Sequence, residues 1–191
     1  MDPNGLEAKD VGFIVYRDDN SKLSISDKTY RGLDRIGFYN SKTGEIFNLY
    51  HAQTYVSHSD YPVGNTLEIF MGGFSIQYLG NVTESGQVLY NKESSKYEGP
   101  VFNIQNANTK GLGLTNEQGQ IIGDPDTSPI RVYSNYNVNT NQEVNMASGG
   151  CLMYVYAQAD DFASFLERSG VEPGDTINGY IKEYFEPWKR H

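Results

Sequence analysis

The sequence contains one cysteine among its 191 residues and no long apolar run. A single thiol excludes an internal disulfide framework and a cysteine-rich zinc site, because both need several cysteines. No stretch approaches the roughly 20 apolar residues of a membrane-spanning helix. The start of the chain also lacks the basic and apolar segments of a signal peptide. We therefore expect no membrane span, and the redox compartment stays open.

Positive charge is scarce too. Fifteen lysines and arginines stand against 24 acidic residues, which gives a formal net charge of −9, and the basic residues are scattered along the chain. Nucleic acid binding depends on clustered basic side chains, so we exclude nucleic acid as a partner. The aspartate pairs do not fit a calcium-binding loop, and no phosphate-binding glycine motif is present. We predict no metal and no cofactor.

Glycine, asparagine and tyrosine are abundant, with 20 glycines and 15 tyrosines. Aromatic and β-branched residues suit strands, and glycine and asparagine suit turns. The candidate strands follow one another without intervening helices, which predicts a mainly β fold, an antiparallel sandwich or barrel. These strands are Val11 to Tyr16, Arg35 to Asn40, Glu45 to Val56, Leu67 to Leu79, Gln87 to Tyr90, Val101 to Gln105, Ile130 to Ser134 and Thr176 to Tyr184.

One short helix is predicted in the C-terminal half. Gln158 to Arg168 places alanines, phenylalanine and leucine on one face, and two aspartates lie in its first turn. We expect residues 1–10 to be flexible and residues 11–191 to form a single β-rich domain. Within that domain Asn106 to Pro129 is typical of a long surface loop.

Cys151 is the candidate reactive group. It follows Ser148-Gly149-Gly150, and the glycines allow close approach of a substrate and free backbone amides to stabilise an oxyanion. A catalytic cysteine also needs a group that lowers its pKa or accepts its proton. A lone cysteine that only packs in a core is the alternative.

The residues around Cys151 resemble the signature of L,D-transpeptidases of the YkuD type. The strand Ile130-Arg131-Val132-Tyr133-Ser134-Asn135 is followed, fourteen residues after Tyr133, by Ser148-Gly149-Gly150-Cys151-Leu152. The acidic helix, the turn and the last strand that follow are similar to the family's pattern as well. The resemblance covers residues 130–184. Both motif histidines are replaced, one by Tyr133 and the other by Gly149, and Met153 stands where the family has arginine or asparagine.

The resemblance implies a β-rich domain of L,D-transpeptidase-like type that acts on the stem peptides of peptidoglycan. Cys151 would be the nucleophile, with the amides of Gly150 and Cys151 at the oxyanion and Tyr133 lining the pocket. His51, on the strand Glu45 to Val56, is the candidate base. Substrate-binding positions would be Ser148, Gly149, Ser134 and Asn135.

Two other functions remain open. Loss of both histidines is compatible with a degraded enzyme that binds envelope peptide or glycan without turnover, and a structural or interaction protein is the third possibility. The first two place the protein in the periplasm, at the cell surface or outside the cell, and the oligomeric state is left open. Tyrosines are candidates for a stacking surface for sugar or peptide if several prove exposed on one face. They are Tyr50, Tyr55, Tyr61, Tyr78, Tyr90, Tyr97, Tyr133, Tyr136, Tyr154 and Tyr156.

Overall fold

The structure is a computed structural model of the 191-residue chain. It describes residues 7–17, 34–54, 68–69, 72–86, 88–105, 109–110, 131–144, 146 and 151–183. The strands are β1 Glu7–Arg17, β2 Asp34–Asn40, β3 Ile46–Ala52, β4 Glu68–Ile69, β5 Gly72–Val82, β6 Gly99–Gln105, β7 Thr109–Lys110, β8 Arg131–Ser134, β9 Tyr136–Asn137, β10 Gln142–Glu143, β11 Leu152–Tyr154 and β12 Thr176–Glu183. The helices are η2 Tyr90–Lys92, η3 Tyr156–Gln158 and α1 Ala159–Arg168, of which η2 and η3 are 3₁₀ helices.

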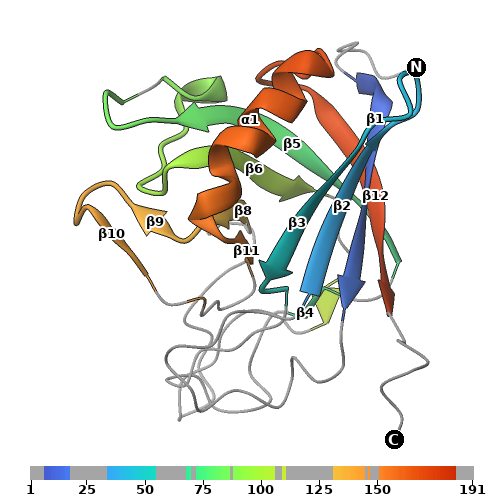
Figure 1. The fold of residues 1–191 in the computed structure, drawn as a ribbon, viewed down its shortest axis with the longest axis horizontal. Coiled ribbons are helices and arrows are strands. Elements are labelled where there is room, and N and C mark those ends of the chain that lie inside the picture. Colours follow the sequence, from blue (N-terminus) through green and yellow to red (C-terminus); the bar gives the residue numbers. More distant parts are fainter. Residues whose placement is uncertain are drawn as a thin grey trace, which may run out of the picture.

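Eight strands form one curled sheet in the order β11-β8-β6-β5-β12-β1-β2-β3 (Figure 1). Just beyond β3, Gln53 pairs with Met153 of β11, and each backbone N–H donates to the other's carbonyl at 2.8 and 2.9 Å. This bridge joins the two edge strands and nearly closes the sheet into a barrel. Closure protects edges that would otherwise present unpaired backbone groups.

The mainly β prediction is confirmed, but its antiparallel detail is only partly right. β1 pairs with β12 in parallel, and β8 pairs with β11 in parallel. The other pairs of the large sheet are antiparallel. Both parallel pairs join strands that are not connected by a hairpin, as parallel pairing requires.

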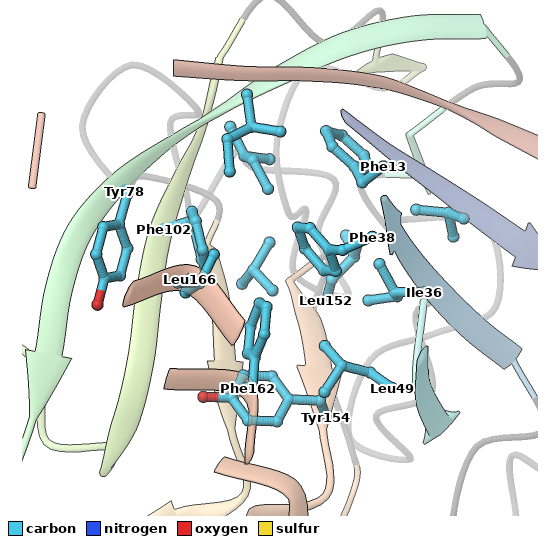
Figure 2. Packing of buried hydrophobic residues seen from close by; sticks show 14 of the residues in the cluster. Phe13, Ile36, Phe38, Leu49, Tyr78, Phe102, Leu152, Tyr154, Phe162 and Leu166 are labelled. Atoms are coloured by element: carbon cyan, nitrogen blue, oxygen red, sulfur yellow. The ribbon is translucent and has the colours of Figure 1, made fainter. Parts of the chain in front are cut away.

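The core is formed by side chains that alternate along the strands between the inner and the outer face of the sheet. Val11, Phe13 and Val15 of β1 face inward beside Ile36 and Phe38 of β2, and all five are buried. The same pattern continues around the sheet, so the inner surface is apolar (Figure 2).

Helix α1 packs against this inner surface and fills the space enclosed by the sheet (Figures 1 and 2). The ring of Phe162 lies 4.7 Å from that of Phe38 and 5.8 Å from that of Phe102, between centroids. Phe165 and Leu166 are also buried. The helix was expected over Gln158 to Arg168. It begins one residue later because Gln158 ends the preceding helix η3.

Two predictions about the elements need correction. Gln87 to Tyr90 was expected as a strand, but Val88 and Leu89 are irregular and Tyr90 begins η2. Leu89 is nevertheless buried, so its apolar character reflects a core contact outside any strand. Strand β1 begins at Glu7, so residues 7–10 of the segment expected to be loose belong to the sheet.

A hairpin turn at residues 41–44 joins β2 to β3. The side-chain oxygen of Asn40 accepts hydrogen bonds from the N–H groups of Lys42 and Thr43, and Gly44 has φ 75°. Most of Asn106 to Pro129 lies outside the described residues, apart from β7, which pairs with β4. No helix in the described part of the chain is long and apolar enough to cross a membrane.

We predict that Gly179→Ala destabilises the fold by about 1–3 kcal/mol, as overpacking of a tight core usually does. A Cβ at this position would lie 2.3 Å from the carbonyl oxygen of Phe13 and 2.6 Å from its ring. Urea denaturation measures the change. Gly73→Ala on the neighbouring strand β5 is the control, because the nearest atom is 3.8 Å away. Equal stabilities of the two variants would contradict the packing described here.

Candidate functional site

Cys151 is held beside β8 by the pairing of two short strands. β8 and β11 run parallel, with Leu152 opposite Val132 and Met153 opposite Tyr133. Cys151 immediately precedes β11 and is therefore level with the start of β8. Its sulfur accepts a hydrogen bond from the backbone N–H of Arg131, with an N to Sγ distance of 3.4 Å.

The phenol of Tyr133 is a second neighbour of this sulfur, and the two side chains are hydrogen-bonded. Cys151 is partly buried. Burial raises the pKa of the Cys151 thiol, and the hydrogen bonds from Arg131 and Tyr133 and the Arg131 charge oppose that rise without cancelling it. The thiol is therefore protonated at neutral pH, which is the unreactive form.

Tyr133, which was expected to replace the base histidine of L,D-transpeptidases, is no proton acceptor. Burial raises the pKa of its phenol far above the ordinary value of 10.0, and the neighbouring Cys151 and Tyr97 raise it further. A phenol in this state keeps its proton and donates it in hydrogen bonds. Tyr133 can therefore orient or stabilise the sulfur but cannot deprotonate it.

An aromatic surface lies next to the sulfur. The ring of Tyr133 stacks on Tyr97, with centroids 4.3 Å apart and planes inclined by 14°. Lys96 places its ammonium 5.4 Å from the centroid of the Tyr97 ring. Tyr97 and Tyr133 are only partly buried. The stacked pair thus offers a partly exposed surface beside Cys151.

The guanidinium of Arg131 is fixed in place. It forms an ion pair with Glu93 at 2.6 Å and donates to the side-chain oxygen of Asn103 at 3.1 Å and to the carbonyl of Ser94. The site therefore contains a cation whose position is set by three partners. Glu93 balances much of its charge, which weakens its effect on the nearby thiol.

Ser134 and Asn135, expected to contact substrate, have side chains engaged inside the fold. Ser134 is fully buried, donates to the carbonyl of Glu98 and accepts from the N–H of Tyr136. The Asn135 side chain donates to the carbonyl of Val144 and accepts from the N–H of Tyr156. We assign both residues to the framework that joins β8, β10 and η3.

His51, the candidate base, lies at the exposed end of β3 with φ 55°. In the antiparallel bridge between Gln53 and Met153, His51 lies on the side of Val155, whereas Cys151 lies on the other side of Met153. Val155 is four residues from Cys151, about 13 Å along an extended segment at the usual rise per residue. The described residues do not bring His51 and Cys151 together. Ser148, Gly149 and Gly150 lie outside the described residues.

The structure adds Arg131 and Tyr97 to the site. Arg131 was part of the motif segment but no role was predicted for it, and Tyr97 was grouped with other tyrosines. No pattern in the sequence links residue 97 with residue 133, since Tyr97 lies outside the named strands and is brought to Tyr133 only by the fold. Of the other predicted stacking tyrosines, Tyr78 and Tyr154 are buried in the core, Tyr136 stacks on Tyr156, and Tyr50 is exposed.

A separate shallow depression of about 570 Å³ is lined by Thr83, Glu84, Ser85 and Glu98. The described part of the chain contains no group of three or more histidine, cysteine, aspartate or glutamate side chains that could hold a metal ion.

No protein-family model matches the chain, and no curated protein matches it either. The likeness to L,D-transpeptidases therefore depends on the residues of the 130–184 segment alone.

We predict that Cys151 reacts with iodoacetamide more slowly at neutral pH than a free cysteine does, because alkylation proceeds through the thiolate. The raised thiol pKa means that the rate climbs only as the pH rises above the ordinary thiol range. Tyr133→Phe removes a donor to the thiolate, so its rate at a given pH should fall by up to roughly tenfold. Intact-protein mass spectrometry follows the reaction.

Tyr136→Phe is the matched control for this loss of a hydroxyl. The Tyr136 hydroxyl donates to Asn141 on the surface and does not contact Cys151. Its alkylation rate should equal that of the native protein. An unchanged rate in Tyr133→Phe would show that the phenol does not act on the sulfur.

Proposed function

We propose that this chain is a binding domain of L,D-transpeptidase-like type that recognises peptidoglycan stem peptides without cleaving them. The observation that carries the proposal is the Tyr133 to Cys151 hydrogen bond. It sets a proton-donating phenol against the sulfur at the position where the family has a base. The protein would act in the periplasm, at the cell surface or outside the cell, where this polymer occurs.

The absence of turnover follows from proton chemistry. Acyl transfer needs a thiolate and a group that takes the thiol proton. Burial raises the pKa of Cys151, and the neighbouring phenol has a raised pKa as well. Within the described residues the available imidazole, His51, lies away from the sulfur. Among the residues that the structure describes, the site has surfaces for binding and no group beside the sulfur that would accept its proton.

The proposed contact surface is the partly exposed group formed by Tyr97, Tyr133 and Cys151. Stacked phenols provide an apolar face and hydrogen-bonding tips, which suit a peptide that contains both methyl groups and amides. Lys96, above the Tyr97 ring, supplies a cation for a peptide carboxylate. A bound stem peptide would therefore lie across the Tyr97 ring with its carboxylate toward Lys96.

An active acyl transferase or hydrolase is the second candidate, favoured by the two hydrogen bonds that the Cys151 sulfur accepts. Both lower the thiol pKa, as does the Arg131 charge. In this version Cys151 attacks a peptide carbonyl and forms a thioester, which an amine or water then resolves. A structural protein in which Cys151 only packs would show neither binding nor adduct.

Co-sedimentation with purified peptidoglycan tests the proposal. The native protein should pellet with the polymer, and Tyr97→Ala should pellet several-fold less because the partly exposed ring is lost. Tyr136→Ala is the control, since Tyr136 stacks on Tyr156 away from the sulfur. Failure of the native protein to pellet contradicts binding.

Intact mass after incubation with a stem peptide or a carbapenem separates the two versions. The binding domain should show no mass increase. A covalent adduct that Cys151→Ala abolishes would establish the enzyme instead.

A further inference from the structure

The outer face of the strands β12, β1, β2 and β3 carries a group of exposed apolar side chains. Five large hydrophobic residues are exposed among those that the structure describes, and four belong to this face. They are Tyr39 of β2, Ile46 and Tyr50 of β3, and Tyr180 of β12, exposed by 39, 69, 50 and 42 %. Alternation along each strand points them away from the core. Exposed apolar residues gathered on one face indicate a binding surface.

Glycines lie opposite the two tyrosines at the centre of this face. Tyr39 is paired with Gly12 of β1, and Tyr180 is paired with Gly73 of β5. A Cβ on Gly12 would fall 2.3 Å from the tip of the Tyr39 ring. The ring of Tyr39 therefore lies low across β1, toward β12, and needs glycine beneath it.

Tyr16 of β1 lies beside Gly37 on the same face, at an ordinary contact distance. An edge atom of its ring lies 3.5 Å from the position of a Cβ on Gly37, and the Arg35 guanidinium sits 4.2 Å from the ring centroid. Gly12 thus keeps the sheet surface low where the Tyr39 ring crosses it, and over Gly37 the nearest atom to a Cβ would be the side-chain oxygen of Asn48, at 3.1 Å. The result is a shallow platform on which Ile14 lies between the rows of the exposed tyrosines.

Polar side chains alternate with the apolar ones in the rows that cross the strands. Asn48 of β3 is in the row of Gly37, Ile14 and Tyr180. Asn178 of β12 is in the row of Gly12 and Tyr39, and Lys182 is paired with Tyr16. Hydrogen-bonding groups therefore flank each exposed ring.

We propose that this face, the outer platform, binds a linear polysaccharide of β-linked pyranose rings. A pyranose ring has apolar C–H faces, which stack on tyrosine, and hydroxyl groups at its rim, which bond to amides and cations. Tyr39 and Tyr180 lie on strands two positions apart, about 10 Å across the sheet. Because the Tyr39 ring reaches over Gly12 of β1 toward β12, one extended chain of sugars can contact both rings.

The charge of the chain disfavours a second copy as the occupant. Two molecules with a formal charge of −9 repel each other. A neutral glycan is not subject to this electrostatic repulsion. The platform lies on strands other than β8 and β11, so this proposal does not depend on the function proposed for Cys151.

Retention on insoluble chitin and cellulose, followed by titration with chitohexaose and cellohexaose, tests the inference. The native protein should bind at least one of the two polymers. The double variant Tyr39→Ala/Tyr180→Ala should raise the Kd for the oligosaccharide by at least roughly tenfold, because both stacking rings are lost. Tyr39→Phe/Tyr180→Phe keeps the rings and should retain most of the affinity, which separates stacking from a loss of fold.

Two controls make the outcome specific. Val88→Ala removes the exposed apolar side chain that lies off this face, 92 % exposed, and should bind as the native protein does. Tyr136→Ala, which removes a ring from β9 outside this face, should also bind normally. The platform shares no residue with the Cys151 site, so failure of the stem-peptide proposal would leave this result unaffected. The inference is overturned if neither polymer retains the native protein or if the double alanine variant binds equally well. It is also overturned if sedimentation velocity shows a dimer that the double variant dissociates.

Discussion

The parallel pairing of β8 with β11 is the constraint on which the candidate site depends. Met153 is opposite Tyr133 on one side and bridged to Gln53 on the other, so this short strand also closes the sheet. Cys151 is two residues away from that bridge. Because the backbone of β11 is held from both sides, the sulfur is placed at the N–H of Arg131 and the hydroxyl of Tyr133. The strand that closes the sheet therefore also fixes the position of the Cys151 sulfur, and the sulfur cannot move without disturbing that closure.

This placement decides the chemistry of the sulfur. Partial burial favours the neutral thiol because it removes water that would stabilise the thiolate. The hydrogen bonds from Arg131 and Tyr133 replace only part of that stabilisation. Tyr133 is itself held neutral by burial and by its neighbours. Two groups that both retain their protons suit recognition better than nucleophilic attack. Aromatic surface is plentiful, both beside the sulfur at Tyr97 and on the outer platform at Tyr39 and Tyr180.

Much of the fold could be predicted from the sequence because inward residues alternate along the strands and one helix has a clear apolar face. Parallel pairing could not, since nothing local in Glu7–Arg17 reveals that its partner is Thr176–Glu183. In the site, motif spacing indicated Cys151 and Tyr133. The structural engagement of Ser134 and Asn135 was invisible because their partners, Glu98 and Val144, are brought near by the fold. His51 satisfied the alternation rule, but the register at Gln53 determines its distance from Cys151.

The protonation state of Cys151 is the central claim, and the single cysteine makes it directly measurable. Labelling the protein with ¹³Cβ-cysteine yields one resonance, and its chemical shift against pH reports ionisation of this thiol alone. We predict a midpoint above that of free cysteine, with the neutral thiol present throughout the neutral range. A resonance already at the thiolate position at neutral pH would contradict the account and identify an activated nucleophile.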